Sequence, residues 1–158
     1  MKDNIFKLIK ELLNKKSIPF KEVHHKPTFT SEESAKARGE DISIGGKAIV
    51  MKVDKCFKLF VLSASLKINS ASIKRYFRAK KIRFASAEEL SALTGLVPGA
   101  VPPFGEPILP LELFVDNSIL ANKKIAFNAG SLTDSIILEV GDYIKIAKPK
   151  FFDFSIKS

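Results

Sequence analysis

Lys47 is the first residue whose type and setting could do chemistry. It follows Gly45 and Gly46 and comes directly before the segment Ala48 to Val53, which is apolar except for Lys52. A lysine at the end of a strand is most often simply exposed to solvent. A cation held there can also bind a phosphate or a carbonyl oxygen and stabilise negative charge that develops during a reaction.

A segment rich in glycine and proline, Leu93 to Gly105, is the second candidate. Its three glycines permit positive φ or the close approach of another group, and its three prolines fix φ and remove N–H donors. The N–H groups of Gly99, Ala100 and Val101 can therefore point together at a carbonyl or phosphate. The alternative is a rigid connector between two elements, and composition alone favours neither.

Asn128, which precedes Ala129 and Gly130, is the third candidate. Its amide both donates and accepts hydrogen bonds, so it can position a water molecule or a substrate amine. An asparagine at the end of a strand can equally serve to turn the chain. The neighbouring Ser131 has no identifiable histidine base in the sequence and is not interpreted as a nucleophile.

The residues that commonly bind metals do not form a convincing set. His24 and His25 are adjacent, and alternation along a strand lets at most one of them face a pocket. Cys56 is remote from both, and one cysteine excludes an internal disulfide. The acidic pairs Glu32-Glu33 and Glu88-Glu89 lie in helix-start patterns, where acids offset the helix dipole. We therefore expect no metal site.

Charge points to a polyanionic partner. The 158 residues carry a formal net charge of +9, from 26 Lys and Arg against 17 Asp and Glu. Basic residues gather between Lys74 and Arg83, which favours contacts with phosphates. A general enrichment in lysine is the competing explanation.

Targeting features are absent from the sequence. No apolar run approaches the ~20 residues of a membrane span. The charged, amphipathic start of the chain is not a signal peptide. We expect a cytoplasmic protein with no membrane partner.

Hydrophobic periodicity and capping patterns predict an α+β fold. We expect one domain over residues 1–158, with a curved, mixed, barrel-like β-sheet and surrounding helices. A helix is predicted over 4–16, and two more begin at the capping boxes Thr30–Glu33 and Ser86–Glu89 and end at Gly39 and Gly95. Further elements are a helix capped by Ser70, a last helix at 143–147, a hairpin over 48–53 and 57–63, and strands at 20–24, 111–115, 124–128 and 135–140.

Five motifs in this order resemble the YbaK/prolyl-tRNA-synthetase-associated editing domain family, closest to its free-standing YeaK-like branch. They are His25–Thr30, Gly46–Lys52, Leu93–Phe104, Ile125–Gly130 and Asp142–Ala147. Lys26 replaces the first proline of the family's His-Pro-Pro-x-x-Thr-like stretch. The resemblance implies the family's fold and hydrolysis of wrongly charged aminoacyl-tRNA without metal or organic cofactor.

The resemblance also assigns site residues. It implies that Lys47 is the lysine essential in these domains, and that Gly99-Ala-Val-Pro102 is the Gly-x-x-Pro loop whose backbone contacts the aminoacyl carbonyl or the ribose. The attacking group would be water, with the tRNA's terminal hydroxyl as a second participant. Lys47, Gly99 and Asn128 are thus the expected catalytic residues. The expected substrate-binding residues are Ala100, Val101, Pro102, Gly130, His25 and Thr30, although a structural role bonding the backbone is preferred for His25.

The leading hypothesis is a trans-acting deacylase that removes a small amino acid such as Ser, with Thr and Ala as alternatives. Its expected partners are mischarged tRNA and an aminoacyl-tRNA synthetase. Expected tRNA contacts are Lys74, Arg75, Arg78 and Lys81. The alternatives are a non-catalytic module of the same fold that binds tRNA or a synthetase, and a weaker third option, a small-molecule binder with a nucleotide in the same pocket.

Overall fold

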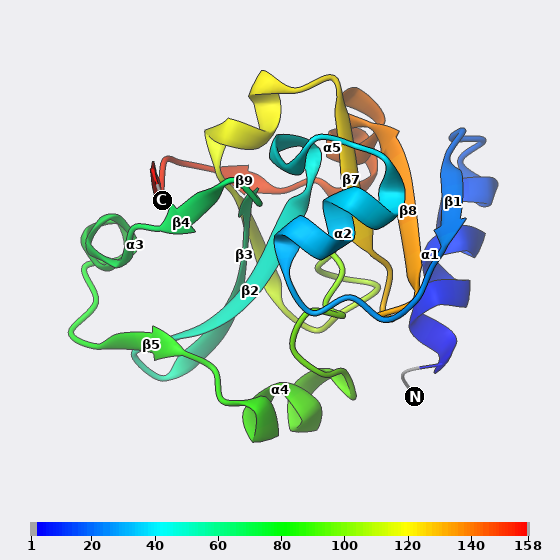
Figure 1. The fold of residues 1–158 in the computed structure, drawn as a ribbon. Helices are drawn as coiled ribbons and strands as arrows, with labels where there is room; N and C mark the ends of the chain where they lie inside the picture. Colours follow the sequence, from blue (N-terminus) through cyan, green and yellow to red (C-terminus); the bar gives the residue numbers. More distant parts are fainter. Residues whose placement is uncertain (1–2, 158) are drawn as a thin grey trace.

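The structure, a computed structural model, describes residues 3–157 (Figure 1). Its helices are α1 (Asp3–Lys15), α2 (Ser31–Arg38), α3 (Ser70–Phe77), α4 (Ala87–Thr94) and α5 (Val140–Ala147), with short 3-10 helices η1 (Ile42–Ile44) and η2 (Asn117–Ala121). Its strands are β1 (Lys21–His24), β2 (Gly46–Val53), β3 (Cys56–Ser63), β4 (Leu66–Ile68), β5 (Ile82–Phe84), β6 (Glu112–Val115), β7 (Lys124–Asn128), β8 (Asp134–Glu139), β9 (Lys150–Phe151) and β10 (Ser155–Lys157).

A five-stranded mixed sheet with the order β5-β2-β3-β6-β9 forms the centre of the fold. Alternate residues of β3 enter two different hydrophobic clusters: Leu59 and Val61 enter one, Phe60 and Leu62 the other. Both faces of β3 are therefore buried from Leu59 to Leu62. That explains why this part of β3 is a continuous apolar run in the sequence and not an alternating one.

The remaining strands form two smaller antiparallel sheets, β1-β8-β7 and β10-β4. A single parallel bridge between Gly45 and Ala126 links the start of β2 to β7. The predicted α+β class is thus confirmed, with the strands divided among three sheets. In Figure 1, α1 and β1 lie on one side of the molecule, and α3 and β5 lie on the other.

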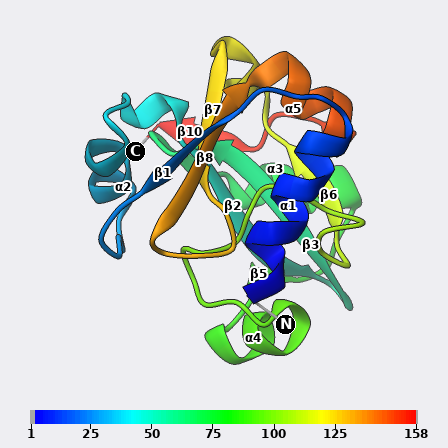
Figure 2. The same cartoon turned by 90° about the vertical axis from the view of Figure 1, so that its right-hand side faces the viewer.

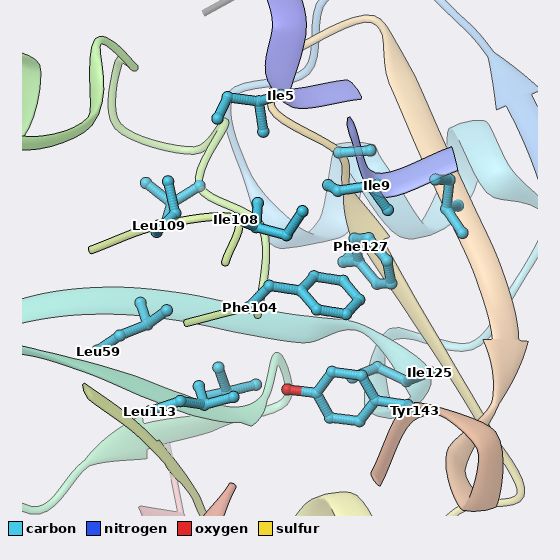
Figure 3. Close-up of a cluster of buried hydrophobic side chains, with 14 of the residues drawn as sticks. Ile5, Ile9, Leu59, Phe104, Ile108, Leu109, Leu113, Ile125, Phe127 and Tyr143 are labelled. Atoms are coloured by element: carbon cyan, nitrogen blue, oxygen red, sulfur yellow. The ribbon is translucent and has the colours of Figure 1, made fainter. Parts of the chain in front are cut away.

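The first hydrophobic cluster lies between α1, the five-stranded sheet and β7-β8. Ile5, Ile9 and Leu13 extend from α1 into this cluster, and Figure 2 shows α1 lying over the strands. In Figure 3 the ring of Phe104 lies between those of Phe127 and Tyr143. Its centroid is 5.6 Å from each of theirs.

Tyr143 ties the glycine- and proline-rich segment to this cluster. Its hydroxyl donates a 2.6 Å hydrogen bond to the carbonyl of Pro103. Burial raises the pKa of Tyr143, so the hydroxyl stays a donor at ordinary pH. The segment is therefore anchored in the core through both Pro103 and the Phe104 ring.

Two predicted boundaries differ from the structure. The side chain that caps α3 is that of Asn69, whose Oδ1 accepts from the Ser72 N–H at 3.2 Å; the prediction of Ser70 was wrong by one residue. The last helix begins at Val140, three residues before the predicted start, because the chain passes directly from β8 into α5. Within residues 3–157 no helix is long and apolar enough to cross a membrane.

Candidate active site

A cavity of about 270 Å³ lies where α2, the start of β2, the end of β7 and the segment Gly99–Pro102 meet. This segment is called the Gly99 loop below. Predicted residues on its wall are Lys47, Gly99, Val101, Asn128 and Thr30. The fold thus brings four of the five motifs, which are distant in sequence, to one place. The other lining residues, none of which was a predicted site residue, are Thr28, Phe29, Ser31, Ser34, Arg38, Gly45, Gly46, Ala48, Ile49 and Ala64.

Lys47 is positioned by the two glycines before it. A Cβ atom on Gly45 would lie 2.9 Å from the Ala64 Cβ, and one on Gly46 would lie 2.6 Å from Ile125 Cδ1. Only glycine lets β2 start this close to its neighbours. The half-buried Lys47 then donates to the carbonyl of Leu66 from its Nζ.

Burial and two neighbouring charges act on the pKa of Lys47 in opposite directions. Loss of hydration lowers the pKa of Lys47, and the positive charge of Lys67 lowers it further. The carboxylate of Glu32 opposes this shift and raises the pKa. A partly dehydrated cation interacts more strongly with a ligand's negative charge than a fully solvated one does.

Gly99 and Val101 both belong to the cavity wall. Gly99 has φ +89°, which places it in the region that glycine tolerates best. The N–H of Ala100 donates to the carbonyl of Val97 at 3.1 Å, so the predicted role of this N–H as a ligand contact is wrong. Within residues 3–157 the N–H groups of Gly99 and Val101 have no acceptor, and both residues line the cavity.

The amide of Asn128 is already used by the protein. Its Nδ2 donates to the carbonyl of Gly99 at 2.8 Å, and its Oδ1 accepts from Arg38 Nη2 at 3.0 Å and from Ser135 Oγ at 3.1 Å. These partners fix which end of the amide carries the oxygen. The contacts favour a role for Asn128 in holding the loop over a direct role in placing water.

Arg38 is the main residue of the site that sequence reasoning missed. Its Nε donates to Ser135 Oγ at 2.9 Å, so its guanidinium bridges Ser135 and Asn128. Burial lowers the pKa of Arg38 to about 10, which leaves it charged at neutral pH. In the sequence, a basic residue just before the helix-ending Gly39 looks like an ordinary partner of the helix dipole.

Other predicted substrate-binding residues lie off the cavity wall. Ala100 and Gly130 line a neighbouring pocket on the far side of the loop, where the Gly130 N–H donates to the Ala100 carbonyl at 2.9 Å. Pro102 is buried and does not line the cavity. Thr30 lines the cavity, but its hydroxyl caps α2 by accepting from the Glu33 N–H at 3.1 Å.

His25 lies behind the cavity, where it supports the wall. Its Nε2 is 2.8 Å from Ser135 Oγ, and its Nδ1 is 2.9 Å from the carbonyl of Lys26. The contact with Lys26 matches the structural role preferred for this histidine. His24 points elsewhere and contacts Asp134 and Glu22.

The basic residues gather at the other end of β2. Lys52, Lys74, Lys80, Lys81 and Arg83 line a pocket together with Asp54 and Ile82. Hydrogen bonds from the N–H groups of Lys81 and Lys80 lower the pKa of Asp54, so the carboxylate stays ionised. Arg83 is paired with Glu89 at 2.7 Å, whereas Arg75 and Arg78 lie outside the pocket.

We expect Arg38→Met to destabilise the protein by about 1.5–3 kcal/mol, the range for hydrogen bonds to a charged group. The substitution removes the bonds to Ser135 and Asn128. Urea unfolding measures the effect. Arg75→Met is the matched control, because within residues 3–157 the Arg75 side chain makes a single hydrogen bond, to Ser72 Oγ at 3.5 Å. Equal unfolding midpoints for the two variants would show that the bridge contributes nothing.

Comparison with known proteins identifies the class. Residues 25–146 match the family model of the aminoacyl-tRNA editing domain, and the chain belongs to this family. The resemblance stated from the sequence motifs is therefore confirmed. The matched range contains every residue of the cavity wall.

The similar proteins include free-standing and fused forms. The chain is 33% identical over 150 residues to the multifunctional Ser/Thr-tRNA deacylase ProXp-y of Escherichia coli (strain K12), covering 90% of the chain and 88% of that relative. It is 35% identical over 108 residues to a proline–tRNA ligase of Bacillus licheniformis, covering 68% of the chain and 19% of the ligase. A crystal structure described as a candidate trans-editing enzyme for prolyl-tRNA synthetase has the same fold, with a TM-score of 0.83 at 22% identity over 96% of each chain.

Proposed function

We propose that this protein is a trans-acting aminoacyl-tRNA deacylase that hydrolyses the ester of mischarged tRNA in the cytoplasm. The observation that carries the proposal is that Lys47, Gly99 and Val101 line one cavity, and that within residues 3–157 the N–H groups of Gly99 and Val101 have no acceptor. A cation and two backbone donors are what a tetrahedral oxyanion requires. Membership of the editing-domain family supports the same activity.

The proposed reaction uses water as the nucleophile. Water attacks the ester carbonyl carbon, and the negative charge that forms on the carbonyl oxygen is stabilised by the loop N–H groups and the Lys47 ammonium. The bond between that carbon and the ribose oxygen then breaks, and the ribose oxygen takes up the proton that the water loses. Because the ester is labile, positioning and preorganised donors supply most of the acceleration.

The proposed substrate carries a small amino acid. Among the relatives, the Escherichia coli protein is named a Ser/Thr-tRNA deacylase, and a cavity of about 270 Å³ suits a small side chain. Incubation with a panel of tRNAs charged with Ser, Thr, Ala and larger residues tests both the activity and its range. If no charged tRNA in the panel is hydrolysed, the chain is a non-catalytic module.

The basic pocket is the proposed contact for the tRNA backbone. Lys52 lies five residues beyond Lys47 on the same strand, and a bound RNA can span this separation of roughly 17 Å, although the two side chains point to opposite faces. Within residues 3–157 Lys52, Lys74, Lys80 and Lys81 donate no side-chain hydrogen bond to the protein. Their ammonium groups are therefore available to phosphates. Arg75 and Arg78 remain predicted contacts beside this pocket.

We expect the double variant Lys74→Glu, Lys81→Glu to raise KM about tenfold with little change in kcat. The slope of log affinity against log salt should fall in magnitude by about 2, one for each lost phosphate contact. Lys7→Glu, Lys15→Glu on α1 changes the net charge equally and should leave the slope unchanged. If both double variants behave alike, net charge and not this pocket governs binding.

We expect activity to be independent of a metal ion. Within residues 3–157 no three side chains of His, Cys, Asp or Glu converge on a point that could hold one. The substrate for this test is a short aminoacylated acceptor mimic, because full tRNA needs magnesium for its own fold. Enzyme treated with EDTA should keep its full rate. A loss that zinc restores would contradict the metal-free mechanism.

A further inference from the structure

Phe29 carries the most exposed large hydrophobic side chain in residues 3–157, with 75% of its surface accessible. It also lines the cavity that holds Lys47. Within the same residues its ring has no aromatic partner and no cation over its face. An unpaired aromatic ring at the edge of a polar cavity is a surface for a flat, apolar group to cover.

The backbone that carries Phe29 is held firmly on both sides. The Phe29 N–H donates to Glu33 Oε1 at 2.9 Å, and the Thr28 N–H donates to the Leu132 carbonyl at 3.2 Å. The buried hydroxyls of Thr28 and Ser34 lie 2.8 Å apart, which ties the segment to α2. The ring is therefore displayed at a fixed position, and its exposure is not the product of a loose loop.

We propose that Phe29 stacks on the base of the 3′-terminal nucleotide of the RNA whose ester lies beside Lys47. The inference rests on the proposed function, because the ester belongs to the ribose of that same nucleotide. A base attached to this ribose must lie within one nucleotide of the cavity, and Phe29 is the aromatic residue on its wall. Unpaired terminal bases are bound in this way by aromatic side chains.

Stacking on Phe29 would also orient the ester. The base anchors one side of the ribose, while Lys47 and the Gly99 loop hold the carbonyl on the other. Each contact then limits the rotation that the other permits. Phe29 is in this sense a positioning residue that acts on the nucleotide and not on the amino acid.

A binding cycle with uncharged RNA tests the proposal. The two RNAs are an acceptor-stem hairpin that ends in adenosine and the same hairpin with an abasic terminal nucleotide. We expect Phe29→Ala to weaken binding of the first about tenfold, within the range measured for base–aromatic stacking, and binding of the second less than about twofold. Phe29→Tyr should bind both RNAs as the original protein does.

Leu120→Ala is the control, because Leu120 is 46% exposed and does not line the cavity. It should leave both affinities unchanged, and all variants should keep the original melting temperature.

An equal loss of affinity for the two RNAs, or no loss for either, would overturn the stacking. An equal loss would place Phe29 against another part of the partner. If Phe29 discriminates between the two RNAs but no charged tRNA is hydrolysed, the proposed deacylase activity is overturned and the stacking stands. If charged tRNA is hydrolysed but Phe29→Ala binds the two RNAs with an equal loss of affinity, the stacking is overturned and the deacylase activity stands.

Discussion

Replacing Lys47 by alanine is expected to lower the single-turnover rate of deacylation by about 100-fold or more, the cost of removing one donor from an oxyanion site. The Lys47 side chain lines the cavity from the start of β2, where it is half-buried and partly stripped of water. Among residues 3–157 no other lysine and no histidine lines the cavity wall, and Arg38 is engaged by Ser135 and Asn128. The rate is measured with enzyme in excess over substrate, so that weaker tRNA binding does not enter.

Lys52→Ala is the matched control for Lys47→Ala. The two lysines share a strand, but Lys52 points to the opposite face, where its Nζ lies 5.6 Å from the centre of the Phe57 ring. Its loss is expected to change the rate at saturating enzyme by less than about twofold. Full activity in a well-folded Lys47→Ala protein would remove Lys47 from the mechanism.

Gly99→Val is expected to have the second large effect, a loss of about 100-fold in rate. A β-branched residue is strained at φ +89°, and its Cβ would lie 3.3 Å from Leu132 Cδ2. Relief of that strain moves the loop that carries the Gly99 and Val101 N–H groups. It also pulls the Gly99 carbonyl away from the Asn128 amide.

Ala100→Ser tests whether the Gly99 effect belongs to the backbone. It changes a side chain in the same loop without demanding a new φ, and the Ala100 N–H is already bonded to Val97. The rate should fall less than about threefold, since the donors stay in place. Equal and small losses for the two variants would show that the loop is only a connector.

Local sequence signals predicted the helices and turns whose ends are determined by residues close to them in the sequence. The capping boxes at Thr30 and Ser86 and the left-handed glycines at Gly39 and Gly95 are all present as expected. The hairpin of β2 and β3 turns at Asp54, as the sequence indicated. Strands β4, β5, β9 and β10 were missed, because two or three residues are too few to show a period.

The sequence could predict those parts of the site whose residues lie within a single motif. It could not predict the hydrogen bonds that the fold makes between residues distant in the sequence. Lys47 and the Gly99 loop do lie together, although their roles remain predictions. The bridge from Arg38 to Asn128 joins residues ninety positions apart and leaves no trace in local pattern. The N–H of Ala100 was misassigned because a turn to Val97 uses it, which composition does not reveal.

The bond from Tyr143 to Pro103 determines how the cavity can move. The wall that presents Gly99 and Val101 continues into Phe104 and the packed core, so it cannot swing open while the core stays folded. The amide hydrogen of Ala100 should accordingly exchange with solvent only at the rate of global unfolding. If the Gly99 and Val101 N–H groups act as proposed, a substrate therefore meets donors that are already in place, and no binding energy is spent on assembling them.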